Sequence, residues 1–367
     1  MKIVTILGTR PEIIRLARVI PKLDALCEHR LVHTGQNFEH ALSDLFLREL
    51  GVRTPDHFLG VRGHTFAEQI AQIIVASERV LTMEKPDRLM LLGDTNSALA
   101  AIVAKRLGIP VFHLEAGNRC YDDRVPEEVN RRIVDHSTDV WMPYTERSRQ
   151  NLLREGMPGD RVFVIGNPIN EIIRHFDPQV CASRVLATLG LQVQGYLIAT
   201  LHRAENVDIE HRLRGFVEAF ERLHREHHVP VVVSTHPRTT QKLEKWGVSA
   251  RSPGVRFLEP FGFFDFVALE RSAMCVLTDS GTVQEECAIL RVPNVTLRDV
   301  TERPETIEGG SNILSGGDPD SVSNCVRVAL SAKVDWGIPR EYLLDNVSDT
   351  VVKIMLGYLH QRSASLR

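Results

Sequence analysis

The sequence lacks the glycine-rich loops that bind the commonest nucleotide cofactors. Neither G-x-G-x-x-G nor G-x-x-x-x-G-K-[ST] occurs anywhere in its 367 residues. The first pattern holds the pyrophosphate of NAD, and the second cradles the phosphates of ATP in P-loop enzymes. Their absence argues against a nicotinamide enzyme and against ATP hydrolysis at a P-loop, and we expect no cofactor.

The sequence also lacks the cysteine pairs that are typical of metal sites and of disulfide-rich domains. The six cysteines are scattered through the chain and form no C-x-x-C pair. Such a pattern is typical of reduced thiols rather than of a zinc site or a disulfide framework. We therefore predict no metal.

The chain has no long apolar run and no excess of one charge. No stretch reaches the roughly 18 continuous apolar residues of a membrane span. The 44 Lys and Arg residues nearly balance the 47 Asp and Glu residues, and the net charge is -3 without a basic stripe. The segment Met1 to Gly8 is too short for the apolar core of a signal peptide. We expect a cytoplasmic protein that binds neither nucleic acid nor a membrane.

What the sequence does contain is a regular alternation of short apolar runs and segments of helical period. This alternation is typical of a parallel β-sheet wrapped by helices. Helices are expected over 12–26, 98–107 and 281–290. The expected strands of the first half span 2–7, 30–33, 88–92, 111–114, 140–142 and 162–165. Those of the second half span 196–200, 229–234, 255–258, 275–278 and 294–297.

The strand pattern restarts between residue 168 and Gly190, which indicates two domains. We predict an α/β protein with two Rossmann-like, doubly wound domains facing a central cleft. The domains span 1–170 and 171–345, and a C-terminal helix within 346–367 packs back on the first domain. In such sheets ligands bind at the carboxyl ends of the strands, where the strand order switches.

Acidic motifs follow the apolar runs of the first half. Glu115 comes directly after an expected buried strand and Asp94 follows another after one glycine, and at such positions a carboxylate must find partners or shift its pKa. Glu127 and Glu128 stand at the start of an expected helix over 127–135, one turn before Arg131. For Glu128 the alternative is a solvated helix start with an i,i+4 ion pair. Together the motifs predict proton-transfer chemistry.

The motif Gly8-Thr9-Arg10-Pro11-Glu12 joins the first expected strand to a helix. Pro11 suits the first turn, where its missing N–H is not needed. Arg10 at this strand end is suited to grip a diphosphate through paired hydrogen bonds. A structural turn with a surface arginine explains the pentapeptide alone equally well.

The second half carries cations and a small-residue helix start at its strand ends. His202-Arg203 and His236-Pro237-Arg238 follow two successive strands, which favours phosphate contacts. Neither histidine has a second histidine four residues away, so metal binding is the weaker interpretation. Asp279-Ser280-Gly281 begins a helix, either as an ordinary N-cap or as an anion site. Glu285-Glu286 one turn later favours a ribose contact nearby.

Taken together, these motifs resemble the non-hydrolysing UDP-N-acetylglucosamine 2-epimerases. The resemblance runs in order along the chain and also includes Thr301-Glu302-Arg303-Pro304-Glu305. It implies the two-domain GT-B fold of B-type glycosyltransferases. It also implies interconversion of UDP-N-acetylglucosamine and UDP-N-acetylmannosamine through elimination of UDP, a 2-acetamidoglucal intermediate, and re-addition of UDP. That route needs carboxylates at the sugar and cations at the diphosphate, and no nicotinamide.

The resemblance also assigns roles to residues of this chain by position. It implies that Asp94, Glu115 and Glu127 are the acid/base carboxylates and that His202 is a further catalytic residue near the diphosphate. The residues that it implies for UDP-sugar binding are Arg10, Arg131, Phe266, Ser280, Gly281, Glu286 and Arg303. A regulatory UDP-sugar site in bacterial members matches Gln36, Glu128, Arg203 and His236.

Several alternatives stay open. Arg15 stands where many family members have lysine, and the segment between Gly117 and Pro126 is shorter than usual. The stretch from Glu115 to Glu128 also resembles the branch that acts on a UDP-2-acetamido-2,6-dideoxy-L-hexose and yields UDP-N-acetyl-L-fucosamine. A hydrolysing epimerase, a glycosyltransferase of the same fold and a non-catalytic UDP-sugar binder are the other candidates. The family is commonly dimeric, so we expect a homodimer.

Overall fold

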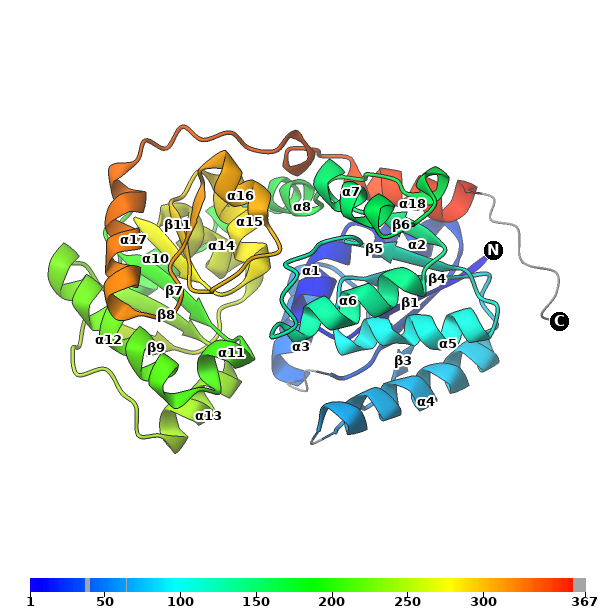
Figure 1. Ribbon diagram of the computed structural model, residues 1–367, viewed down its shortest axis with the longest axis horizontal. Helices are drawn as coiled ribbons and strands as arrows, with labels where there is room; N and C mark the ends of the chain where they lie inside the picture. The colour runs from blue at the N-terminus through cyan, green and yellow to red at the C-terminus, as the bar shows by residue number, and fades with distance from the viewer. Residues whose placement is uncertain (37–39, 64, 359–367) are drawn as a thin grey trace. The chain divides into compact units, whose positions relative to one another are not determined.

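The computed structural model describes residues 1–36, 40–63 and 65–358, and the chain divides into two compact units (Figure 1). The first unit comprises Met1–Ile172 together with Leu344–Arg367, and the second comprises Ile173–Leu343. Each unit is built around its own parallel sheet.

The described part of the first unit contains a six-stranded sheet in the order β3-β2-β1-β4-β5-β6. Every neighbouring pair is parallel. The strands are β1 (Lys2–Leu7), β2 (Glu28–His33), β3 (His57–Phe58), β4 (Arg88–Leu92), β5 (Val111–Leu114) and β6 (Val140–Met142). Strands β4, β5 and β6 are buried at every position, as expected of parallel strands that are covered on both faces.

Helices flank this sheet. They are α1 (Arg10–Leu16), α2 (Ile20–Leu26), α3 (His40–Glu49), α4 (Phe66–Glu84), α5 (Ala100–Arg106), α6 (Pro126–His136), α7 (Glu146–Arg154) and α18 (Val347–Gly357). Helix α8 (Ile169–His175) begins in the first unit and ends in the second. Short 3-10 turns lie at Asn96–Leu99 and Gly159–Arg161. The expected single helix over 12–26 is wrong, because Pro21 has no N–H for a helix interior and instead lies in the first turn of α2.

The second unit repeats the plan with a six-stranded parallel sheet in the order β12-β11-β10-β7-β8-β9. Its strands are β7 (Leu197–Leu201), β8 (Val231–Thr235), β9 (Val255–Leu258), β10 (Cys275–Thr278), β11 (Asn294–Thr296) and β12 (Asn312–Leu314). Its helices are α9 (Asp177–Cys181), α10 (Val185–Leu189), α11 (Ala204–Val207), α12 (Glu210–His227), α13 (Pro237–Lys245), α14 (Phe263–Ser272), α15 (Gly281–Leu290), α16 (Pro304–Gly309) and α17 (Pro319–Ser331), with a 3-10 turn at Arg340–Tyr342.

Three strand predictions need correction. Residues 162–165 form no strand, because only Val162 makes an isolated bridge, to Trp141. Strands β3 and β12 were not expected from the sequence. Both are short edge strands of two or three residues, and segments so short carry no usable period in a sequence.

The core of each unit lies between its sheet and the helices on the sheet's faces. In the first unit β1, β4 and β5 contribute Ile6, Leu91 and Val111 to a cluster with α4 and α5. In the second unit Phe216 and Phe220 of α12 pack on the residues of β7 and β8. Helices α4, α5 and α12 each bury the apolar stripe that their helical period predicts.

The two sheets share one topology. In the first unit the strand order reverses direction between β1 and β4, and in the second between β7 and β10. Ligands of such sheets bind outside the carboxyl ends of the strands at this switch point. The predicted α/β class with two doubly wound domains is thus confirmed, whereas the central cleft stays a prediction.

Helix α18 belongs to the first unit, where it packs beside α2 (red in Figure 1). Lys22 of α2 donates to Asp349 at 2.6 Å, and the N–H of Ser348 donates to Glu171 at 2.8 Å. The Arg88 guanidinium donates to the backbone carbonyls of Met355 and Tyr358 at the end of the helix. Residues 359–367 of the predicted C-terminal segment lie outside the described residues.

Gly8 closes β1 at the switch point of the first unit. A Cβ at this position would lie 2.2 Å from the hydroxyl oxygens of both Ser97 and Thr34. Those two hydroxyls are buried and hydrogen-bonded to each other at 2.7 Å, so they have no room to move aside. A glycine is therefore required where the chain turns from β1 toward Arg10.

Candidate functional site

Glu12 ties together the two loops at the switch point of the first unit. Its carboxylate accepts hydrogen bonds from the N–H of Gly8 at 3.0 Å and from the Thr9 hydroxyl at 2.7 Å, after β1. The Thr95 hydroxyl, after β4, donates to it at 3.3 Å. Burial raises the pKa of Glu12 to about 7, although these hydrogen bonds oppose the shift. The sequence motif contained Glu12, but its burial and its role in joining the loops were not anticipated.

Asp94 and Glu115 share one buried guanidinium. Arg131 of α6 forms an ion pair with the Asp94 carboxylate, and its Nη1 donates to the backbone carbonyl of Glu115 at 2.8 Å. The same Nη1 lies 3.5 Å from Oε1 of Glu115. Because β4 and β5 are neighbours in the sheet, the two carboxylates follow adjacent strand ends. The structure thus brings together three of the predicted site residues.

A second arginine completes the charge cluster. Arg15 of α1 forms an ion pair with Oε2 of Glu115, and its guanidinium lies 5.5 Å from the ring centre of Tyr144. Arg15, Arg131 and Glu115 are each less than 5% exposed, whereas the Asp94 side chain is 18% exposed. Buried charges require such pairing. The arrangement stabilises ionised Glu115 and leaves Asp94 the more accessible carboxylate.

The backbone of Glu115 is itself unusual. Its φ is +63°, in the left-handed region that few residues other than Gly, Asn and Asp adopt. The Arg131 bond to the Glu115 carbonyl holds this conformation. Non-glycine residues in this region concentrate at functional sites, where surrounding contacts over-determine the strained backbone.

Helix α6 presents Glu127 and Arg131 one turn apart. It begins at Pro126, close to the expected start, and Glu127 is half-buried in its first turn. The alternative of a solvated Glu128 is wrong, because this side chain is fully buried, but its i,i+4 ion pair is present, with Oε1 3.8 Å from Nε of Arg132. Its Oε2 accepts a hydrogen bond from the N–H of Cys120 at 2.9 Å. Glu128 therefore ties the start of α6 to the segment that follows Glu115.

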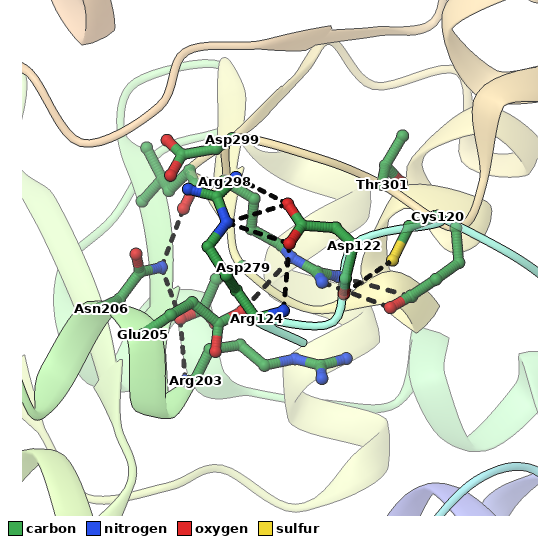
Figure 2. Close-up of polar contacts among 12 residues, drawn as sticks. Cys120, Asp122, Arg124, Arg203, Glu205, Asn206, Asp279, Arg298, Asp299 and Thr301 are labelled. Carbon is green, nitrogen blue, oxygen red and sulfur yellow. Dashed lines mark hydrogen bonds and ion pairs between the residues drawn. The ribbon is translucent and has the colours of Figure 1, made fainter. Parts of the chain in front are cut away.

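At the switch point of the second unit, Asp279 organises the loop after β7 (Figure 2). Its carboxylate accepts from the N–H of His202 at 3.0 Å, the N–H of Arg203 at 2.9 Å and the Asn206 amide at 3.1 Å. Burial by itself would raise the pKa of Asp279, but the facing imidazole of His202 and the two N–H groups lower it overall.

Asp279 also orients the His202 ring. Its Oδ1 lies 2.9 Å from Nδ1 of His202, and the imidazole remains 38% exposed. When Nδ1–H donates to the carboxylate, Nε2 is the nitrogen available for a ligand. The sequence favoured either Ser280 or Asp279 as the N-cap of a helix. In the structure Ser280 holds the N-cap position of α15, and Asp279 binds the neighbouring loop.

The other residues predicted to bind the UDP-sugar lie at the start of α15 and on the segments beside it. Ser280 and Gly281 stand at the N-terminal end of this helix, where the helix dipole favours anions, and the N–H of Ser280 donates to the Thr278 hydroxyl at 2.9 Å. Arg303, which is 3% exposed, pairs with Glu285 of α15. Phe266 is half-buried on α14. These residues all belong to the second unit.

Glu286 is 3% exposed and has a second carboxyl group as a neighbour. Burial, and next the charge of Glu286, raise the pKa of Glu270 well above its ordinary range. Burial and the neighbouring Glu286 carboxylate thus both disfavour the ionised form of Glu270 on α14. No sequence pattern indicated Glu270, because it lies on a different helix.

The four predicted regulatory residues are divided between the units. In the first unit Gln36 accepts from the N–H and the hydroxyl of Ser97, both at 3.1 Å, and Glu128 is buried in α6. In the second unit Arg203 precedes α11, and His236 caps α13 by accepting from the N–H of Arg238 at 3.2 Å. The ring centres of His236 and His202 are 6.3 Å apart.

Arg10, the remaining predicted contact of the first unit, is the first residue of α1, directly after Gly8 and Thr9. Its guanidinium lies 5.7 Å from the ring centre of Phe46.

Among the described residues, no group of three His, Cys, Asp or Glu side chains is placed to hold a metal ion. None of the helices in this same part of the chain is both long and apolar enough to cross a bilayer.

A family model described as UDP-N-acetylglucosamine 2-epimerase matches residues 22–356. The chain belongs to the UDP-N-acetylglucosamine 2-epimerase family. It is therefore an enzyme of the isomerase class, an epimerase. The predicted family membership and enzyme class are confirmed.

Individual relatives cover nearly the whole chain. The UDP-N-acetylglucosamine 2-epimerase of Methanocaldococcus jannaschii is 38% identical over 357 residues, which are 92% of this chain and 95% of the relative. A crystal structure of the M. jannaschii UDP-GlcNAc 2-epimerase in complex with UDP-GlcNAc and UDP covers 97% of this chain and 99% of its own, with a TM-score of 0.92 and 38% identity.

Two other similarities bear on substrate and fold. The UDP-2,3-diacetamido-2,3-dideoxy-D-glucuronate 2-epimerase of Pseudomonas aeruginosa is 36% identical over 343 residues, 91% of this chain and 94% of the relative. The glycosyltransferase WaaG, at 14% identity, has a TM-score of 0.60 and covers 97% of this chain and 100% of its own. That second similarity shows a shared fold alone.

The buried Glu12 predicts a distinct pH dependence of stability. Its native pKa of about 7 lies above the ordinary value of 4.5, so the native state binds more protons between these values, and stability falls as pH rises. Relative to the Glu12→Gln variant, wild type should lose roughly 3 kcal/mol of unfolding free energy between pH 4.5 and 8. Urea unfolding at several pH values measures this difference.

The control for this experiment is Glu78→Gln, because Glu78 is an exposed residue of α4. Its stability should follow the wild-type pH profile. A Glu12→Gln profile that is parallel to wild type would show that folding does not raise the pKa of Glu12.

Proposed function

We propose that this enzyme interconverts UDP-N-acetylglucosamine and UDP-N-acetylmannosamine without hydrolysing them. The observation that carries the proposal is the cluster in which Arg131 and Arg15 hold Asp94 and Glu115 at adjacent strand ends. A cluster of carboxylates at the switch point of a doubly wound sheet suits proton transfer at a bound sugar. The M. jannaschii relative, 38% identical, has been crystallised with UDP-GlcNAc and UDP.

In the proposed reaction a carboxylate removes the proton at C2 of the sugar. The electron pair of the C2–H bond forms the C1=C2 double bond, and the C1–O bond breaks with its electron pair leaving on UDP. The resulting 2-acetamidoglucal then takes a proton at C2 on its other face, and UDP adds back to C1. Asp94, Glu115 and Glu127 are the proposed proton-transfer residues, which gives carboxylates to both steps.

The arginines of the first unit have a defined part in this proposal. The two guanidinium partners of Glu115 favour its ionised form and lower its affinity for a proton. Asp94 has one such partner and is more exposed. This asymmetry supports different roles for the two carboxylates.

The second unit supplies the proposed UDP site. The N-terminal end of α15, at Ser280 and Gly281, suits the diphosphate through the helix dipole, and Arg303 adds a cation. His202, oriented by Asp279, is proposed to stabilise the departing diphosphate, as is Arg10 of the first unit. We assign the ribose hydroxyls to Glu286 and the uracil to Phe266, from the family resemblance.

The sugar itself is the least constrained part of the proposal. The P. aeruginosa relative is named for a UDP-2,3-diacetamido-2,3-dideoxy-D-glucuronate, so relatives at nearly equal identity differ in their sugar. A UDP-2-acetamido-2,6-dideoxy-L-hexose remains the second candidate. The homodimer, the cytoplasmic location and the regulatory site at Gln36, Glu128, Arg203 and His236 stay predictions.

Product analysis tests the proposed reaction. The enzyme should convert UDP-N-acetylglucosamine into an equilibrium mixture with UDP-N-acetylmannosamine, with both sugars still attached to UDP, because the intermediate is recaptured. NMR of the reaction mixture distinguishes these products from free sugars. Accumulation of free N-acetylmannosamine and UDP would instead establish a hydrolysing epimerase, and turnover of the 6-deoxy-L-hexose substrate alone would reassign the sugar.

Substitution of the carboxylates tests the residue assignment. Asp94→Asn, Glu115→Gln and Glu127→Gln should each lower kcat by about 10² or more, because each removes a group proposed to transfer a proton. Glu146→Gln, an exposed residue in the first turn of α7, is the matched control and should keep wild-type kcat. Near-normal turnover in all three variants, with circular dichroism unchanged, would remove these residues from the mechanism.

A further inference from the structure

His113 is a fully buried histidine that lies between the two carboxylate loops of the first unit. It belongs to β5, two residues before Glu115. Its Nε2 lies 2.7 Å from the backbone carbonyl oxygen of Gly93, the residue before Asp94. Its Nδ1 lies 2.9 Å from Oδ1 of Asp135 on α6. The ring therefore links the loop after β4 to the helix that carries Arg131.

The partners of His113 determine the form of the ring. A backbone carbonyl can only accept a hydrogen bond, and an ionised carboxylate can only accept as well. The Asp135 carboxylate also accepts from the backbone N–H of Gly117 and pairs with the Arg119 guanidinium, and both of these partners favour its ionised form. Both ring nitrogens must then donate, which requires an imidazolium with two N–H groups.

His29 of β2 provides an internal contrast. It is also buried, with Nδ1 2.7 Å from Asp24 and Nε2 2.8 Å from the Thr5 hydroxyl. A hydroxyl can donate as well as accept, so one ring proton satisfies both contacts. Burial lowers the pKa of His29, with Asp24 opposing the shift. His29 therefore needs one ring proton to satisfy its partners, whereas His113 needs two.

Asp135 continues the chain of hydrogen bonds to the other carboxylate loop. Its Oδ2 accepts from the N–H of Gly117 at 3.1 Å and lies 2.7 Å from Nη2 of Arg119. Gly117 lies two residues after Glu115. An unbroken path thus runs from the carbonyl beside Asp94, through His113 and Asp135, to the N–H beside Glu115.

The backbone along this path explains why such a link is needed. Gly93, Glu115 and Gly117 all have positive φ values, of +72°, +63° and +80°. A left-handed conformation strains a residue such as Glu115. The two glycines adopt it without strain but lose more conformational entropy when they are ordered. Contacts from neighbouring residues must therefore hold all three in place. The hydrogen bonds of His113 and Asp135 fix one backbone group on each loop.

We propose that His113, as an imidazolium paired with Asp135, is a positioning residue that sets the separation between Asp94 and Glu115. The inference rests on the proposed function, in which both carboxylates transfer protons at one sugar carbon. Misplacement of a catalytic group by about 1 Å can lower a rate about 10²-fold. Loss of the link should therefore reduce kcat while UDP-sugar binding, assigned to other residues, persists.

The first test measures the ring protons in the wild-type enzyme without reference to activity. In protein labelled with ¹⁵N-histidine, NMR should show protons on both ring nitrogens of His113 and on one ring nitrogen of His29. His113→Gln and His29→Gln variants assign the two sets of signals. A single ring proton on His113 would overturn the imidazolium link, whatever the enzyme catalyses.

The second test measures the consequence for catalysis. A glutamine amide cannot donate to both Gly93 and Asp135 in the manner of the imidazolium. His113→Gln should lower kcat about 10- to 100-fold and leave KM for UDP-N-acetylglucosamine within about threefold. His29→Gln, a buried substitution on a strand that carries neither carboxylate, should keep wild-type kcat. Equal kcat values for wild type and His113→Gln would overturn the positioning role.

A crystal structure of the His113→Gln variant distinguishes failure of the positioning role from failure of the proposed function. The distance between the Asp94 and Glu115 carboxylates should change relative to wild type, and an unchanged distance would overturn the positioning role even in an inactive enzyme. If wild type itself fails to epimerise UDP-N-acetylglucosamine while that distance shifts in the variant, the proposed function is overturned and the structural link stands.

Discussion

The contact on which the site most depends is the one made by the Arg131 guanidinium. It pairs with the Asp94 carboxylate and also donates to the carbonyl of Glu115, whose φ is left-handed. A buried arginine is favourable only when such partners compensate for its lost hydration. Replacing such a buried charge cluster by apolar side chains is often neutral or stabilising. We interpret the cluster as being retained for catalysis rather than for stability.

The fold explains why these residues meet. Strands β1 and β4 in one unit, and β7 and β10 in the other, define equivalent switch points. Glu12 bridges the first pair of loops, and Asp279 bridges the second. Both are buried carboxylates that accept backbone N–H groups. Their electrostatics differ, because Asp279 faces the His202 imidazole while burial dominates at Glu12.

Much of this could be predicted from the sequence, for physical reasons. Strands such as β1 and β4 are continuous apolar runs because both faces of a parallel sheet are covered, and the carboxylates that follow them were recognisable as site residues. What could not be predicted depends on contacts between distant segments. The burial of Glu128 against Cys120, the pairing of Glu270 with Glu286, and the link from His113 to Asp135 and Gly93 leave no periodic signal.

The central claim is that proton transfer at C2 accompanies the loss and return of UDP. The most direct measurement is NMR of the UDP-sugars after turnover in deuterium oxide. Because the proton removed from C2 exchanges with solvent on a carboxylate before the other face is reprotonated, the account predicts deuterium at C2 of the product. Product that retains protium at C2 throughout many turnovers would contradict the account.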